Sequence, residues 1–364
     1  MLTNLRSALT LVLAVSMSIA FTSIPTRAAG SEKALKQRVR ALEETVAGLE
    51  AKLAYMHVEE GTINSVKGPH VIFEDCNVHV RSGSGSTTDG TVDLETRTQI
   101  PNTTPTGLGN LIVGYNENPG DTELFRPGSH NLIVGPYHAF TDVGGVVFGQ
   151  ENDIYEPFAV VTGGFQNDSA GYCASVSGGQ SNVAAGKRSS VSGGINNSAE
   201  ASFSSVSGGN SNQALSGSSS VSGGFMNQAK GDYSSVSGGR LGTASGESSA
   251  VSGGDHNAAT GLDSSISGGT TNVAEGVSSS VSGGNTGQAT GNVSSITAGT
   301  GNIASGSYSS ISGGYQCTAS GIAASVSGGE LNTASGHQSS LSGGFDHSAP
   351  DVNDWVAGGL FQTE

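Results

Sequence analysis

A fifteen-residue repeat runs through most of this chain. Residues 219–239 read SSVSGGFMNQAKGDYSSVSGG, so the same six letters open and close the stretch. With the valine of SSVSGG as position 0, an aliphatic residue recurs every fifteen residues from Val146 to Val356, in the pattern x-S-S-V-S-G-G-x-x-N-x-A-x-G-x. A flexible Gly/Ser linker has no reason to keep such a register, so the pattern predicts an ordered array of structural units.

The composition of one unit favours β structure. Fifteen residues are too few for the helix pair of most helical repeats, and each glycine inside a helix costs about 1 kcal/mol. Two short strands fit instead: Ser-Val-Ser with its valine inward, and Asn-x-Ala-x with its alanine facing that valine. Glycines at positions +2, +3 and +10 are expected at tight turns, often with positive φ. The predicted fold is mostly β, a parallel β-roll or β-solenoid of 15-residue coils over residues 146–347.

Asparagine at position +6 predicts an internal ladder of side-chain amides. Gly242, Gly287, Cys317 and His347 replace asparagine in four units and interrupt the ladder. Burying one valine returns about 1.5–3 kcal/mol, whereas ordering fifteen residues costs about 20 kcal/mol. Each coil is therefore expected to depend on hydrogen bonds to its neighbours, on stacked identical side chains and on burial against other chains.

The repeat has distinct ends. Two related segments, GNLIVGYNE and HNLIVGPYH, predict degenerate first coils and a loop within residues 111–145. Strand-like runs in residues 58–110 predict a small β neck. Residues 348–364 depart from the consensus and are expected to form a C-terminal cap, in which Trp355, Leu360 and Phe361 cover the last coil.

A heptad pattern precedes the β segments. In residues 31–57, apolar residues alternate at spacings of four and three from Leu35 to Met56. Such a narrow stripe favours an N-terminal coiled-coil helix over a helix packed on a globular core. Valine at position a with leucine at position d favours two strands, so the helix alone does not choose between a dimer and the homotrimer predicted for the whole chain.

The N-terminal segment predicts export, and the net charge bears on the choice of partners. Residues 1–28 have a basic start, a short apolar run and a Thr-Arg-Ala end, which predict a signal peptide over the alternative of a membrane anchor. Removing Arg6 and Arg27 with this segment changes the net charge from −15 to −17, which disfavours nucleic-acid binding. Cys76, Cys173 and Cys317 leave several pairings open, unpaired thiols included.

The SVSGGxxNxASGxxS units, with the short coiled coil, resemble the head repeats of trimeric autotransporter adhesins. The likeness covers about residues 131–364. It implies a YadA-type left-handed parallel β-roll, wound as a trimer and used for attachment to surfaces or matrix. This chain differs in its period, which is about fourteen in that family, and in placing the helix before the repeats; no C-terminal membrane barrel is expected.

No catalytic, cofactor-binding or metal-binding residue is predicted. The histidines have no acidic partner at a recurring spacing, and a P-loop, zinc spacing or Ser-His-Asp signature is not found in the sequence. The predicted function is a non-enzymatic, secreted or cell-surface bacterial rod, adhesin-like, whose repetitive faces contact surfaces or extracellular matrix. The alternatives are a purely structural extracellular fibre or coat component, an ice-binding solenoid and a phage-type fibre.

Overall fold

The computed structural model describes residues 29–63, 65–100, 103–117 and 125–358, in two compact units. The first unit ends at His79 and the second begins at Val80, within the segment predicted as a neck. The predicted signal peptide, Leu360 and Phe361 lie outside the described residues.

The first unit contains a helix and two small antiparallel sheets. Helix α2 covers Ala29–Lys52, with Glu32 in its first turn and Lys52 in its last, where the helix dipole favours these charges. Strand β1 (Met56–Glu59) pairs with β4 (His70–Phe73), and β2 (Thr62–Ile63) pairs with β3 (Val66–Lys67). The helix is shorter than the predicted coiled coil of residues 31–57, because Met56 is taken up by the β1 pairing with Phe73.

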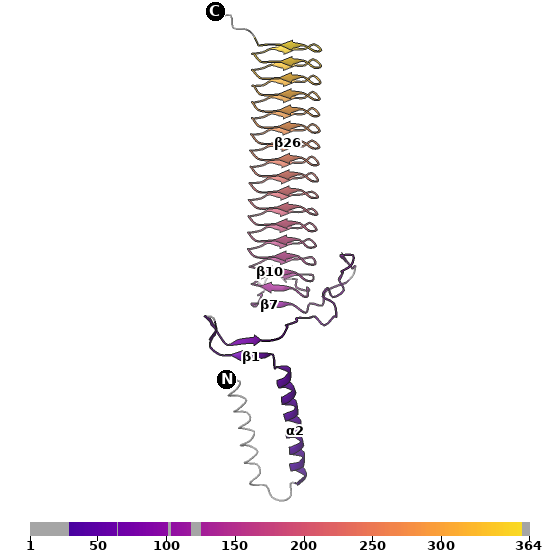
Figure 1. Ribbon diagram of the computed structural model, residues 1–364, viewed down its shortest axis with the longest axis vertical. Coiled ribbons are helices and arrows are strands. Elements are labelled where there is room, and N and C mark those ends of the chain that lie inside the picture. Colours follow the sequence, from indigo (N-terminus) through magenta and orange to yellow (C-terminus); the bar gives the residue numbers. More distant parts are fainter. Residues whose placement is uncertain (1–28, 64, 101–102, 118–124, 359–364) are drawn as a thin grey trace, which may run out of the picture. The chain divides into compact units, whose positions relative to one another are not determined.

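The second unit is a parallel β-solenoid, visible in Figure 1 as a stack of coils. Its first ladder follows positions −1 and 0 of the repeat. The strands of this ladder are β7 (Leu111–Val113), β8 (Leu132–Val134), β10 (Val146–Phe148), β12 (Val160–Val161), β14 (Ser175–Val176), β16 (Ser190–Val191), β18 (Ser205–Val206), β20 (Ser220–Val221), β22 (Ser235–Val236), β24 (Ala250–Val251), β26 (Ser265–Ile266), β28 (Ser280–Val281), β30 (Ser295–Ile296), β32 (Ser310–Ile311), β34 (Ser325–Val326), β36 (Ser340–Leu341) and β38 (Trp355–Val356).

The second ladder follows positions +7 and +8 and has 15 strands. They are β9 (Ala139–Phe140), β11 (Asp153–Ile154), β13 (Asp168–Ser169), β15 (Val183–Ala184), β17 (Ser198–Ala199), β19 (Gln213–Ala214), β21 (Gln228–Ala229), β23 (Thr243–Ala244), β25 (Ala258–Ala259), β27 (Val273–Ala274), β29 (Gln288–Ala289), β31 (Ile303–Ala304), β33 (Thr318–Ala319), β35 (Thr333–Ala334) and β37 (Ser348–Ala349). A line of single parallel bridges at position +4, from Gln150 to Phe345, adds a third connection between coils that was not predicted. The short hairpin of β5 (Val92–Asp93) and β6 (Thr98–Gln99) precedes the first coil.

The core is the predicted pair of columns. Val236 at position 0 is 1% exposed and Ala244 at position +8 is fully buried, as in the other regular coils. A third inward column was missed: the first serine of SSVSGG, such as Ser234, is also buried. Ser204, in the same column, donates its hydroxyl hydrogen bond to the Ala201 carbonyl 2.7 Å away. A single chain therefore encloses its own core, and the coils do not need neighbouring chains to bury these columns.

The asparagine ladder is confirmed. Asn182 is fully buried, and its Nδ2 donates to the carbonyls of Gly178 in its own coil and Gly194 in the next, each 3.0 Å away. Its Oδ1 accepts from the backbone N–H of Asn197 at 2.9 Å. One side chain thus satisfies three backbone groups inside the stack, which explains why asparagine recurs there.

Filling a gap in this ladder is expected to stabilise the fold. The backbone N–H of Gly242 still donates to Asn227 Oδ1 at 2.8 Å, but glycine has no side-chain amide to donate hydrogen bonds to the neighbouring carbonyls. A Cβ at Gly242 would meet this same Oδ1 at 3.1 Å, and the φ of Gly242 is not positive. Gly242→Asn should therefore raise the free energy of unfolding by about 1 kcal/mol. Thermal melts test this, with Gly238→Asn on the open surface of the same coil as the control; a lower melting temperature for Gly242→Asn alone would contradict it.

The predicted period of fifteen fails at the first coils. Val147, not Val146, is fully buried and pairs with Val161, so this coil has fourteen residues. Ile133 pairs with Val147, again fourteen residues away. The missing residue lies in the first turn, where Phe148-Gly149 stands in place of Thr162-Gly163-Gly164. Two adjacent valines concealed the shift, since either could be placed in the core column.

The three glycines of each unit have different roles. The +3 glycines have positive φ, as predicted, for example 90° at Gly224. The +2 glycines mostly do not, and Gly223 has open space where a Cβ would lie. At +10 the reason is close approach rather than φ: a Cβ on Gly276 would lie 1.9 Å from the Gly291 carbonyl oxygen. Ala201 nevertheless occupies +10 in one coil, so that turn can adjust.

Candidate functional surface

One face of the solenoid carries two regular columns of serine side chains and is here called the serine face. It consists of positions −1 and +1 of the first ladder, from Ser175 to Ser342. The +1 serines are exposed, and the −1 serines are half-buried except for the exposed Ser265, so the outward orientation predicted for both columns is complete only at +1. Ala250 and Thr297 are the substitutions within these columns, and neither brings a charge. The serine face therefore presents uncharged hydroxyl groups in register along the stack.

The opposite face, at position +7, varies from coil to coil. From Val183 to Ile303 this position holds valine, serine, glutamine, threonine, alanine and isoleucine in different coils. Gln228 donates its side-chain amide to Gln213 at 2.7 Å, which links two neighbouring coils. Such variation is unlike the serine face and does not present one chemical group repeatedly.

Trp355 lies on the serine-face side of the last ladder strand rather than over the core. It pairs in register with Ser340, and its side chain is 67% exposed. Val356 is the residue of β38 that packs on the core cluster. The capping role predicted for residues 348–364 therefore does not rest on Trp355, and its other proposed members lie outside the described residues.

A buried carboxylate organises the base of the second unit. Asp89 accepts hydrogen bonds from the hydroxyls of Ser82 at 2.6 Å, Thr106 at 2.6 Å and Ser129 at 2.5 Å. Although burial opposes ionisation, these hydrogen bonds hold the pKa of Asp89 well below its usual range. The carboxylate thus connects Ser82 and Thr106 to Ser129, which lies just before strand β8.

This cluster contains serine, histidine and aspartate, but it is not arranged as a nucleophilic triad. His130 Nδ1 lies 3.7 Å from Asp89 Oδ1, and its Nε2 accepts from the backbone N–H of Ser82 at 3.2 Å. Since Nε2 already accepts a backbone hydrogen bond, it is not available to take a proton from a serine hydroxyl. The serine hydroxyls themselves donate to the carboxylate, so the cluster has a structural role.

Two aspartates stack at the start of the second ladder. Asp153 and Asp168 are register partners on β11 and β13, and Tyr155 donates its hydroxyl to Asp153 at 3.0 Å. Desolvation and the nearby charge of Asp153 raise the pKa of Asp168 to about 6. The ionised form of Asp168 therefore weakens the folded state. The loss of stability builds up as the pH rises from about 4, the ordinary pKa of an aspartate, and is complete above about 6.

Asp168→Asn is expected to stabilise the protein at about pH 8 and to leave it nearly unchanged at about pH 3, below the ordinary pKa of an aspartate. Because Asp168 retains partial solvent exposure, the gain at the higher pH should be near 1 kcal/mol rather than the full value of the shift. Thermal melts at both pH values measure it, with the exposed Asp263→Asn as the control. An equal gain at both pH values would show that charge repulsion is not the cause.

The other ionisable groups are dispersed. His138 is buried inside the asparagine ladder, where its Nδ1 accepts from Asn152 N–H at 3.1 Å. His256 contacts Asp255, which is held by Arg240 through two hydrogen bonds on the exposed edge. Within the described ranges, no group of three or more His, Cys, Asp or Glu side chains could hold a metal ion.

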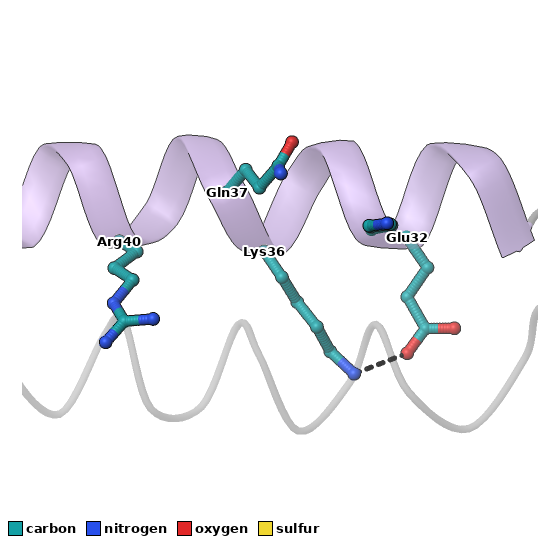
Figure 2. A pocket seen from close by; sticks show the side chains of 5 residues that line it. Glu32, Lys36, Gln37 and Arg40 are labelled. Atoms are coloured by element: carbon teal, nitrogen blue, oxygen red, sulfur yellow. Dashed lines mark ion pairs between the residues drawn. The ribbon is translucent and has the colours of Figure 1, made fainter.

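A shallow depression on α2 offers no better site. Figure 2 shows Glu32, Lys36, Gln37 and Arg40 projecting from the same helix, with Lys33 completing its lining. Lys36 Nζ lies 2.8 Å from Glu32 Oε1, an i, i+4 pair with both side chains about half exposed. These solvent-exposed groups have the arrangement of an ordinary charged helix surface.

The three cysteines are free thiols: Cys76 is exposed, Cys173 is half-buried and Cys317 is buried. Cys317 occupies a ladder position, and its backbone N–H donates to Asn302 Oδ1 at 2.9 Å. Among the helical residues that the structure describes, no segment is both long and apolar enough to cross a membrane.

No protein-family model matches the sequence, and no curated protein matches it. The fold and the chemistry of its surfaces therefore carry the functional argument. The serine columns were visible in the sequence, whereas the Asp89 cluster was not, because it brings together residues from different loops and has no sequence motif. The Asp153–Asp168 pair follows from the fifteen-residue period, since both residues occupy position +7, but it was not singled out.

Proposed function

We propose that this protein is a non-enzymatic, secreted or cell-surface rod that attaches to surfaces or extracellular matrix through its repetitive faces. The observation that supports this most directly is the serine face, an uncharged array repeated in register from coil to coil. Weak contacts repeated at a fixed spacing add up to strong attachment, which one pocket of the same chemistry does not achieve. The dispersal of the ionisable groups in the described residues favours binding by surfaces over catalysis.

Attachment should decline in steps as coils are removed. Deleting one, three and five whole units between residues 176 and 340 shortens the array without changing its chemistry, and binding to matrix-coated and plain surfaces can be compared for each length. A control pair, Asp255→Asn and His256→Ala, should leave attachment unchanged. Complete loss from either single substitution would reveal a discrete site instead. If the protein does not attach to any of these surfaces at any length, the full length included, the purely structural fibre becomes the favoured function.

Helix α2 is proposed to join copies of the chain into a trimer. Leu35, Leu42, Val46 and Leu49 are 41–61% exposed along its heptad stripe, which is the surface a coiled coil would bury. Light scattering on residues 29–364 is expected to give three chain masses. Leu42→Ser with Leu49→Ser should give one chain mass, and a monomer before substitution would contradict the proposal.

A further inference from the structure

Large apolar side chains follow a two-coil period along one edge of the solenoid. At position +4 the bridge partners run Phe165, Gln180, Ile195, Asn210, Phe225, so that an apolar residue alternates with an amide. Ile195 is 44% exposed and Phe225 is 42% exposed. At about 4.8 Å between coils, the apolar residues are about 9.6 Å apart.

This segment is also free of charge in an acidic protein. Positions +4 and +5 from Phe165 to Met226, here called the neutral edge, contain apolar, amide and hydroxyl side chains. Charged residues begin immediately outside it, with Glu151 before it and Arg240 after it. Ser211 donates to Asn210 Oδ1 at 2.7 Å, which orients one of the intervening amides.

We propose that the neutral edge binds an uncharged β-1,4-linked polysaccharide lying along the stack. In such a polymer successive sugar rings are flipped, so the same ring face returns at every second sugar, at a repeat close to the spacing of the apolar residues. Apolar side chains pack on these ring faces, and the amides of Gln180 and Asn210 can both donate to and accept from the sugar hydroxyls. The inference rests on the proposed surface-contact function and names its ligand class.

Charge and occupancy distinguish this edge from the opposite one. A neutral polymer matches the uncharged edge, whereas an anionic polymer would be repelled by the net charge of −15. On the opposite edge, at position +12, the ring of Phe203 already faces the guanidinium of Arg188 at 5.5 Å. Phe203 is 54% exposed, more than the apolar residues of the neutral edge, but its column also holds charged residues such as Arg188 and Asp263. The neutral edge therefore differs from the opposite edge in its lack of charge.

The experiment measures retention of the full chain on insoluble cellulose and on chitin, with the α-linked glucan starch as the control polymer. Binding to cellulose, chitin or both is expected, and the two arms show which sugar is preferred. Phe225→Ala should weaken this binding about tenfold, the effect of losing one ring contact. The matched control is Tyr308→Ala, an exposed aromatic residue on the opposite edge, which should leave binding unchanged.

A positional swap tests the spacing itself. Ile195→Asn combined with Asn210→Ile keeps the composition and moves the central apolar residue by one coil, so binding should fall about as far as in Phe225→Ala. Both positions lie on the surface at the same place in the repeat, and circular dichroism melts verify that the fold is kept. Retained binding after the swap would overturn the two-coil argument.

The remaining outcomes separate this inference from the proposed function. Equal retention on starch, or no retention on either β-linked polymer, rejects the polysaccharide as the ligand. If the protein still attaches to another surface in that case, the proposed surface-contact function stands. A change in mass by light scattering for Phe225→Ala would assign the neutral edge to contact between copies and overturn the proposal. Loss of attachment to every tested surface would reject both.

Discussion

Replacing Gly224 by alanine is expected to lower the melting temperature of the array steeply, whereas alanine at the adjacent Gly223 is expected to change it little. Gly224 has a φ of 90°, which alanine adopts only under strain. Its Cβ would also lie 2.2 Å from the Gly239 carbonyl oxygen and 2.4 Å from Asn227 Nδ2. The clash involves main-chain atoms of the next coil, so rotation of a side chain cannot relieve it.

The loss for Gly224→Ala should be about 3 kcal/mol or more, since backbone strain and disruption of the asparagine ladder act together. Gly223 has no atom within 4 Å of its Cβ position and no positive φ. The equivalent +2 position already holds alanine in one coil, at Ala298. Circular dichroism melts of the two variants make the comparison, and similar melting temperatures would show that the stack can widen at this turn.

The period predicted the columns of the solenoid well because each column repeats one physical requirement. Valine, alanine and asparagine each recur where a side chain of that size and polarity is enclosed, as at Val191, Ala199 and Asn197. The fourteen-residue coil ending at Val161 could not be placed in the same way, since Val146 and Val147 are chemically alike. Only the pairing of Val147 with Ile133 and Val161 resolves them.

Backbone conformation was less visible in the sequence. Positions +5 and +12 have positive φ in nearly every coil, yet residues as different as Leu241, Thr271 and Val293 occupy them. Thr271 and Val293 are β-branched and are strained there, so sequence preference would have placed the turns elsewhere. Hydrogen bonds between coils compensate: the Leu241 N–H donates to the Phe225 carbonyl, and the Val293 N–H donates to the Val277 carbonyl.

The candidate surfaces were predictable from the sequence only where a feature repeats in every coil. The serine face repeats every coil and was therefore predicted from the consensus. The neutral edge repeats every second coil and disappears when positions are averaged over all units, although its thirty-residue spacing from Phe165 to Phe225 is present in the sequence. The Asp89 cluster joins Ser82, Thr106 and Ser129, which lie far apart in the sequence and share no local pattern.

Val236→Asp is expected to be the most damaging substitution in the core. Val236 is 1% exposed and lies between Val221 and Val251 in the first ladder. These ladder neighbours are apolar and cannot pair with a carboxylate. Burying an unpaired charge costs several kcal/mol, even after its pKa rises. Ser237→Asp places the same group one residue away on the exposed serine face and should change stability little.

The consequence should extend beyond one coil, because each coil of a solenoid is stabilised through its two neighbours. Val236→Asp removes that coupling in the middle of the array, so the thermal melt should become broader as well as shift to lower temperature. Val236→Thr, which keeps the shape and adds a hydroxyl, should fall between the two aspartate variants. Equal melting temperatures for Val236→Asp and Ser237→Asp would mean that position 0 does not face the core, and the inward assignment of the whole valine column would have to be abandoned.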